Sequence, residues 1–318
     1  MGNFINPFTD FGFKKLFGTE ENKECLLHFI NQLLEQEGED KITSITYDNK
    51  EQLGRKVSDR YAVFDIYCIT EKGEHIIIEL QNAKQKNVTD RSLYYTTFPI
   101  QSQGVKGSWD YSINKIYSIT ILNFTLDYLK LPEDEYLHTI QLYKRENNML
   151  FYDKLMFIYL EMPKFKKRED ELTNDFEKWM YFIKNLERLE KIPKKYRDTL
   201  FEKMFAAAEI AKLDKMEYRR YIKSKKAIND YDNAINYARE EGKLEGRLEG
   251  ELKGRSEGKL EGQLEGESKG KLEGKLEIAR TMLKMGKLID EIVLITGLSK
   301  EQIEELGMKN EEQEKRYL

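Results

Sequence analysis

The sequence predicts a protein of the α/β or α+β class, in which a mixed sheet is flanked by helices. Residues 61–70 and 75–81 are two apolar runs separated by a short polar break that contains Gly73, a pattern typical of a β-hairpin. Residues 115–124 are almost continuously apolar, which indicates a strand at the centre of a sheet. Residues 19–36 instead repeat their apolar side chains at the helical period.

The remaining elements follow from the same patterns. Shorter apolar runs predict strands at residues 42–48, 137–143 and 155–162. Residues 88–103 predict a helix that is interrupted near Pro99 and turns Leu93, Tyr94 and Phe98 inward. Beyond about residue 168 the pattern becomes helical, with apolar stripes in residues 176–186 and 200–210.

Three polar residues of the predicted hairpin form the candidate site: Asp65, Glu79 and Gln81. If the hairpin is symmetric about Lys72, Asp65 lies opposite Glu79 with the Cβ atoms about 5 Å apart, and Gln81 shares the face of Glu79. Two carboxylates in an apolar setting repel each other, and burial raises their pKa values. A divalent cation bound between them would stabilise both anions, and hard oxygen ligands suit Mg²⁺ or Mn²⁺. An acidic pair can also simply face solvent, but the apolar run before Glu79 favours a site at the edge of a buried strand.

The same residues resemble a known family. An Asp followed 14 residues later by Glu-x-Gln is similar to the core of the PD-(D/E)XK nucleases, with Gln in place of the usual Lys. More closely, the chain resembles the Rpn family of recombination-promoting nucleases and putative transposases. The resemblance covers roughly residues 1–165 and implies a restriction-endonuclease-like fold. It is carried by residues 8–18 (FTDFGFKKLFG), 64–68 (FDIYC), 77–81 (IIELQ), 90–95 (DRSLYY), 109–111 (WDY) and 116–122 (IYSITIL).

This resemblance implies Mg²⁺-dependent cleavage of DNA, with Mn²⁺ able to substitute. Asp65 and Glu79 would be the metal ligands and would be catalytic together with Gln81, while Asp10 and Tyr94 would support them. Gln81 stands where most such nucleases have Lys. Its amide is neutral and can only orient a water or a phosphate by hydrogen bonds. We therefore expect slower chemistry, or a greater dependence on the metal, than with Lys.

The overall charge does not identify a nucleic-acid-binding protein. The chain has 318 residues, of which 35% are charged, and a formal net charge of −4, so contact with DNA requires a local basic patch. Lys84, Lys86 and Arg91 follow the candidate site, and Lys14 lies in the N-terminal motif. These four are the candidate DNA-binding residues, although each is also compatible with an ordinary solvated side chain.

Residues 241–277 repeat Glu-Gly-Lys-Leu with drift, and glycine recurs at every fourth position from Gly242 to Gly274. A period of four exceeds the 3.6 residues of a helical turn, so the leucines spiral around a helix and do not form a coiled-coil seam. Each interior glycine costs roughly 1 kcal/mol relative to alanine. Ion pairs such as Glu249–Lys253 and Glu265–Lys269 offset only part of this cost. The segment is predicted to be a marginal helix or a flexible spacer that becomes ordered on association.

Three short helices are predicted after the repeat, at residues 278–285, at residues 288–295 and from Lys300 onward. Ser299 and Gln302 form a capping box for the last of them. The spacing is that of a helix-turn-helix, but three glutamates near the start of the last helix oppose contact with DNA phosphates. A packing or oligomerisation element is favoured. The predicted organisation is a nuclease-like domain at residues 1–165, a helical region at 166–238, a low-complexity helical extension whose repeat spacer is 239–277, and a small helical element at 278–318.

Other features of the sequence bound the function. Cys25 and Cys68 lie in apolar contexts and are expected to be buried, reduced thiols. No apolar run of about 18 residues predicts a membrane helix and no secretory signal is visible, so a cytoplasmic location without membrane contact is expected. The leading hypothesis is a metal-dependent DNA endonuclease linked to recombination, mobile elements or defence, acting as a homo-oligomer. The alternative is a weakly active or inactive DNA-binding or oligomeric interaction protein that retains the nuclease fold, and Gln81 keeps this alternative open.

Overall fold

The computed structural model describes residues 3–48, 51–52, 62–85, 87–104, 107, 109–197 and 199–314. The chain forms two compact units, residues 1–234 and 235–318. The helices of the first unit are α1 (Asp10–Phe17), α2 (Lys23–Leu33), α3 (Val88–Ser102), α4 (Asp175–Asn185), α5 (Thr199–Ala208) and the first part of α6 (Lys215–Lys284). Its strands are β1 (Ile45–Tyr47), β2 (Glu51–Gln52), β3 (Ala62–Val63), β4 (Ile66–Thr70), β5 (His75–Gln81), β6 (Ile116–Leu122), β7 (Leu137–Lys144) and β8 (Met149–Glu161).

Six strands form one mixed sheet in the order β1-β4-β5-β6-β8-β7. β4 and β5 are the antiparallel hairpin predicted from the sequence, whereas β5, β6 and β8 run parallel to one another. The crossover from β5 to β6 contains α3, as a parallel connection requires. β2 and β3 form a separate two-stranded sheet. The prediction of a mixed sheet flanked by helices is thereby confirmed.

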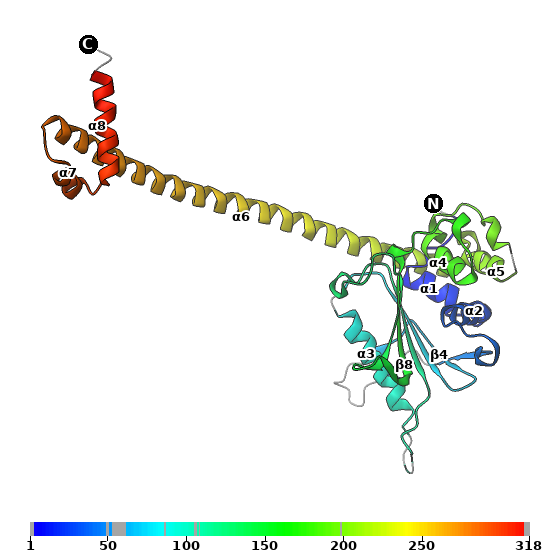
Figure 1. The fold of residues 1–318 in the computed structure, drawn as a ribbon. Helices are drawn as coiled ribbons and strands as arrows, with labels where there is room; N and C mark the ends of the chain where they lie inside the picture. Colours follow the sequence, from blue (N-terminus) through cyan, green and yellow to red (C-terminus); the bar gives the residue numbers. More distant parts are fainter. Residues whose placement is uncertain are drawn as a thin grey trace. The chain divides into compact units, whose positions relative to one another are not determined.

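The two faces of the sheet are covered by different helices, as Figure 1 shows. One face, together with α1, α2, α4 and α5, builds the main core, to which the hairpin contributes Ile66, Cys68, Ile76 and Ile78. The alternate residues of the same strands point to the other face, where Tyr67 and Ile77 pack against Tyr95 and Phe98 of α3. The start of β4 and the end of β5 therefore lie between α1 on one side of the sheet and α3 on the other.

The main core continues beyond residue 165. Trp179 of α4 is fully buried, and its ring centroid lies 5.8 Å from that of Phe17 in α1. Tyr221, in the second turn of α6, is also buried, and its hydroxyl accepts a hydrogen bond from the backbone N–H of Asn6 at 3.1 Å. This contact fixes the first turns of α6 against the N-terminal segment and so places them beside α1.

Helix α3 differs from the prediction in two respects. It passes through Pro99 without interruption. Leu93 and Tyr94 are 54% and 43% exposed, so the prediction that they face inward is wrong, whereas Phe98 does pack against the sheet. The prediction failed because the sheet beneath α3 is partly polar: Ser92 Oγ lies 3.4 Å from Thr120 Oγ1 of β6. The buried residues of α3 are Val88, Ser92, Thr96 and Pro99.

The repeat is helical, which is one of the two alternatives left open by the sequence. α6 extends through it without a break to Lys284. The ion pair between Glu265 and Lys269, at 3.8 Å, is present as predicted, and similar pairs join Arg247 to Glu251 and Lys271 to Glu267. The leucines of the repeat remain exposed, Leu252 by 71%. The expected boundaries at residues 238 and 277 both fall within α6 and stay predictions.

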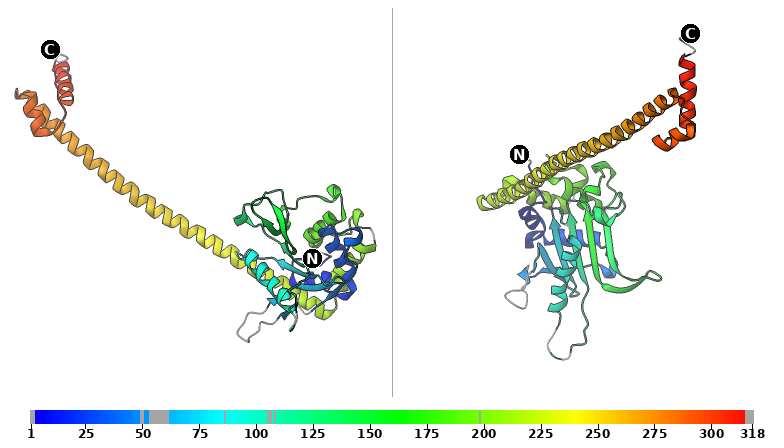
Figure 2. Two further views of the ribbon diagram at one scale, coloured as in Figure 1. Left: turned by 60° about the horizontal axis from the view of Figure 1, so that its bottom comes forward. Right: turned by 90° about the vertical axis from the view of Figure 1, so that its left-hand side faces the viewer.

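The second unit ends in α7 (Ile289–Thr296) and α8 (Lys300–Glu314), which follow the end of α6 (Figure 2). The backbone N–H of Ser299 donates to Gln302 Oε1 at 2.9 Å, and that of Gln302 donates to Ser299 Oγ at 3.3 Å, which confirms the capping box. These contacts fix the start of α8. The small core of the unit consists of Ala279, Ile292, Leu298, Ile303 and Leu306.

Two further expectations concern cysteines and membranes. Cys25 and Cys68 are both buried and free, as predicted. Across the described ranges, the chain contains no helix with both the length and the apolar character needed to cross a membrane.

Candidate active site

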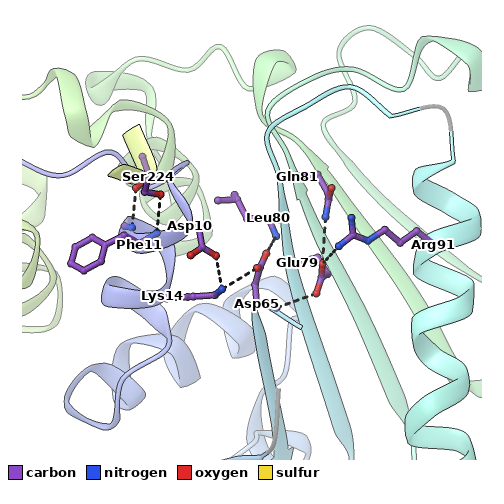
Figure 3. A network of polar contacts seen from close by, with 11 residues as sticks. Asp10, Phe11, Lys14, Asp65, Glu79, Leu80, Gln81, Arg91 and Ser224 are labelled. Carbon is purple, nitrogen blue, oxygen red and sulfur yellow. Dashed lines mark hydrogen bonds and ion pairs between the residues drawn. The ribbon is translucent and has the colours of Figure 1, made fainter. Parts of the chain in front are cut away.

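Asp65 and Glu79 meet at the end of the β4–β5 hairpin. Ile66 pairs with Ile78, so the register is centred on Lys72, and it brings Asp65, just before β4, opposite Glu79. The backbone N–H of Asp65 donates to Glu79 Oε1 at 3.1 Å, and the backbone N–H of Leu80 donates to Asp65 Oδ2 at 2.8 Å. Figure 3 shows the two carboxylates side by side between α1 and α3. The predicted proximity of Asp65 and Glu79 is therefore observed.

Burial makes this carboxylate pair electrostatically unfavourable when both groups are charged. Glu79 is 5% exposed, and burial, followed by the neighbouring Asp65 carboxylate, raises the pKa of Glu79 to about 8. Burial also raises the pKa of Asp65, although the hydrogen bond from Leu80 and the charge of Lys14 act in the opposite direction. Both shifts have the same sign, so the pair retains a proton more readily than two isolated carboxyls would.

Two cations from different helices flank the pair. Lys14 of α1 forms ion pairs with Asp10 and with Asp65, the latter at 3.7 Å. Burial acts to lower the pKa of Lys14, but the hydrogen bond and charge of Asp10, and then those of Asp65, raise it above its usual value. On the other side, Arg91 of α3 lies 3.3 Å from Glu79 Oε2.

The position of Arg91 is fixed by the ring of Tyr95. The guanidinium carbon lies 4.9 Å from the centroid of that ring, a cation–π contact between residues one helical turn apart. Arg91 Nε is buried and has no hydrogen-bond partner among the described residues.

Gln81 lies on the same face of β5 as Glu79, as predicted. Its side chain is 7% exposed, and Nε2 donates to Glu79 Oε2 at 3.3 Å. Arg91 Nη2 donates to the same oxygen. Gln81 and Arg91 therefore both hydrogen-bond to Glu79 Oε2.

The other residues predicted from the sequence lie at different distances from the pair. Asp10 lines the same hollow as Asp65. Lys84 is exposed and pairs with Asp127, and Lys86 lies outside the described residues. Tyr94 packs edge-on against Phe98.

Sequence reasoning missed the part of the site that α6 contributes. Ser224 Oγ accepts a hydrogen bond from the backbone N–H of Phe11 at 3.3 Å, which joins α6 to α1 beside the carboxylates (Figure 3). Ser224 also lines the hollow that contains Asp65. Phe11 and Ser224 are 213 positions apart along the chain. The one available signal was the basic composition of residues 215–226, which contain six Lys or Arg and one Glu.

The donor set of the pair suits a hard divalent cation. Mg²⁺ is commonly held by one or two carboxylates and keeps several waters, and Asp65 and Glu79 supply two adjacent carboxylates. Within the described ranges no group of three or more His, Cys, Asp or Glu side chains is arranged to hold a metal. A metal bound at this site would therefore take its remaining ligands from water, backbone oxygens or substrate.

The fold and the acidic pair together define a class of protein. A mixed sheet flanked by helices, with two carboxylates at the end of its hairpin, has the architecture of a restriction-endonuclease-like nuclease. A family model described as PD-(D/E)XK nuclease family transposase matches residues 7–238, and the chain belongs to this family. The resemblance found in the sequence is thus confirmed, and the match extends well beyond residue 165. No curated protein and no solved structure matches the chain.

Proposed function

We propose that the protein is a metal-dependent DNA endonuclease in which Asp65 and Glu79 hold Mg²⁺, with Mn²⁺ able to replace it. Membership of a nuclease family supports hydrolysis of phosphodiester bonds. The observation that carries the proposal is the buried Asp65–Glu79 pair, because burial and then the neighbouring Asp65 carboxylate raise the pKa of Glu79, and a bound cation would offset both effects. When bound, the metal would lower the pKa of a water and neutralise charge on the phosphate.

The protein's own residues would orient the substrate around this pair. Gln81 would orient a water or a phosphate oxygen through its amide, and its buried position next to Glu79 supports this role. Lys14 and Arg91 would balance the negative charge of the carboxylates before substrate binds.

The broader setting is also part of the proposal. The family description includes transposases, which favours a role in recombination or mobile elements over defence. The exposed leucines of α6 support homo-oligomerisation through the repeat. The buried free cysteines are compatible with a reducing compartment such as the cytoplasm.

Conversion of supercoiled plasmid to nicked and linear forms tests the activity. The wild-type protein should cut in Mg²⁺ and be inactive in chelator, and Asp65→Asn should cut at least roughly 100-fold more slowly because a metal ligand is lost. Asp40→Asn, at an exposed position on η2 (Gly38–Asp40), is the matched control and should cut as the wild type does. Equal rates for Asp65→Asn and the control would refute the assigned site.

The second candidate is a DNA-binding or oligomeric protein that has lost catalysis. The specific observation in its favour is Gln81, which supplies no cation at the position where most related nucleases have Lys. This alternative predicts that the wild-type protein binds DNA but fails to nick it in either Mg²⁺ or Mn²⁺. The same plasmid assay, combined with a binding measurement, separates the two functions.

A further inference from the structure

A hollow on the first unit leads from the acidic pair to a basic surface. Its outer part has a volume of about 670 Å³ and is lined by residues of α1 and of the first turns of α6. The adjoining inner part, about 260 Å³, reaches Asp65. The two parts share Asp10, Ser224 and Ala227 in their walls, so they lie next to each other.

The outer part carries an excess of positive charge. Four of its lining residues are cationic, and they are opposed by Asp10 and Glu217. Both acids are already paired, Asp10 with Lys14 and Glu217 with Lys15. We call this surface the basic groove, and its cationic residues are Lys14, Lys15, Arg220 and Lys223.

Arg220 and Lys223 are the cations of the basic groove that form no close ion pair among the described residues, although the charge of Arg220 helps to lower the pKa of Asp214. Both are exposed, and neither has an acidic oxygen of the described residues within ion-pairing distance. They lie three positions apart on α6 and so project from the same side of the helix. This local excess occurs in a chain whose formal net charge is −4, so a composition-wide bias toward positive charge does not explain it.

We propose that the basic groove binds the sugar-phosphate backbone of DNA, with Arg220 and Lys223 as its phosphate contacts, and leads the strand to Asp65 and Glu79. The proposal rests on the proposed nuclease function for the identity of the ligand. The guanidinium of Arg220 matches phosphate geometry, and Lys223 adds a point charge. An acidic polypeptide would satisfy the same cations, but only a nucleic acid also places a scissile bond at the end of the groove.

The test compares two double variants of the full-length protein with equal changes in charge. Arg220→Ala/Lys223→Ala removes the groove cations. Arg219→Ala/Lys226→Ala removes one Arg and one Lys from neighbouring turns of α6 that do not line the groove, and both of these are also exposed. Binding is measured by fluorescence anisotropy with a labelled DNA duplex in chelator, over roughly 50–200 mM salt, where phosphate contacts dominate.

The groove variant should bind DNA about tenfold more weakly or worse, and its slope of log affinity against log salt should fall by about 1–2. The control variant should bind within about twofold of the wild type, because its charges are away from the groove. Equal binding by the two variants would overturn the proposal. A groove-dependent affinity for poly-glutamate that exceeds the affinity for DNA would overturn it as well, in favour of an acidic protein partner.

The cleavage assay separates this proposal from the proposed function. If the wild type cuts plasmid but the groove variant binds and cuts like the control, the nuclease assignment stands and the basic groove is refuted. If DNA binding depends on Arg220 and Lys223 while no metal supports cutting, the groove is supported and the nuclease assignment fails. Failure of the wild type to bind DNA at all would refute the groove.

Discussion

The raised pKa of Glu79 predicts a specific dependence of stability on pH in the metal-free protein. An unfolded chain releases the Glu79 proton near pH 4.5, whereas the folded protein retains it until about pH 8. The folded state therefore binds the extra proton between these values. The stabilisation from Glu79 is complete below about pH 4.5 and is lost as the pH rises toward 8. The substitution Glu79→Gln should remove this effect, because Gln does not titrate.

The magnitude follows from linkage. One extra proton in the folded state lowers the free energy of unfolding by about 1.4 kcal/mol for each unit of rising pH. Between pH 5 and pH 7 the loss is about 3 kcal/mol, a substantial part of the 5–15 kcal/mol typical of a domain. Asp65 titrates in the same direction, because burial raises its pKa too. Because Asp65 and Glu79 share the proton, the loss of stability is spread over the pH range in which the pair titrates.

Urea denaturation in chelator at several pH values between 5 and 8 measures the effect. Trp109 and Trp179, the two tryptophans of the chain, both belong to the first unit, so their fluorescence reports on that unit alone. Groups other than the carboxylate pair titrate in both proteins and cancel in the difference. The difference in unfolding free energy between Glu79→Gln and wild type should therefore rise with pH. Glu133→Gln, at an exposed position, should give no such trend, and parallel pH profiles for wild type and Glu79→Gln would refute the reasoning.

Three other perturbations test the site and the repeat. Asp65→Ala should abolish metal-dependent cleavage and leave the thermal midpoint in chelator equal or higher, because carboxylate repulsion is relieved; a fall of several degrees in calorimetry would contradict this. Gln81→Lys should retain or raise the nicking rate, whereas Gln81→Ala should lower it through loss of an orienting hydrogen bond; equal rates for Gln81→Ala and wild type would reduce Gln81 to a strand residue. Deletion of residues 241–277 should preserve the tryptophan fluorescence and DNA-nicking activity of the first unit and reduce the oligomeric state seen by light scattering. Insoluble protein would instead show that the repeat packs on the catalytic domain.

The features that could be predicted from the sequence are local ones. The hairpin register was accessible because two apolar runs and Gly73 fix the turn, and the position of Asp65 opposite Glu79 follows from that register alone. The capping box at Ser299 is likewise contained within four residues. In both cases the interacting groups are brought together by one element and its turn, so no tertiary information is required.

The features that were missed depend on which residues, distant in the sequence, pack against a helix. The inward face of α3 was misjudged because apolar periodicity predicts burial against an apolar surface, whereas Thr120 of β6 presents a hydroxyl there. The contribution of α6 was not visible because Ser224 reaches Phe11 only through the tertiary fold. The helical state of the repeat was left open because its ion pairs offset only part of the glycine penalties, which left a marginal helix and a flexible spacer as alternatives.

The arrangement around Glu79 bears on how the proposed nuclease site would work with Gln at position 81. Glu79 Oε2 lies 3.3 Å from both Gln81 Nε2 and Arg91 Nη2, so the guanidinium already occupies the cationic position beside this oxygen. Lys14 supplies a second positive charge from α1, on the side of Asp65. A Lys at position 81 would compete with Arg91 for the same oxygen. The charge that the motif residue does not provide is therefore present in the site, carried by two helices that the hairpin sequence alone does not reveal.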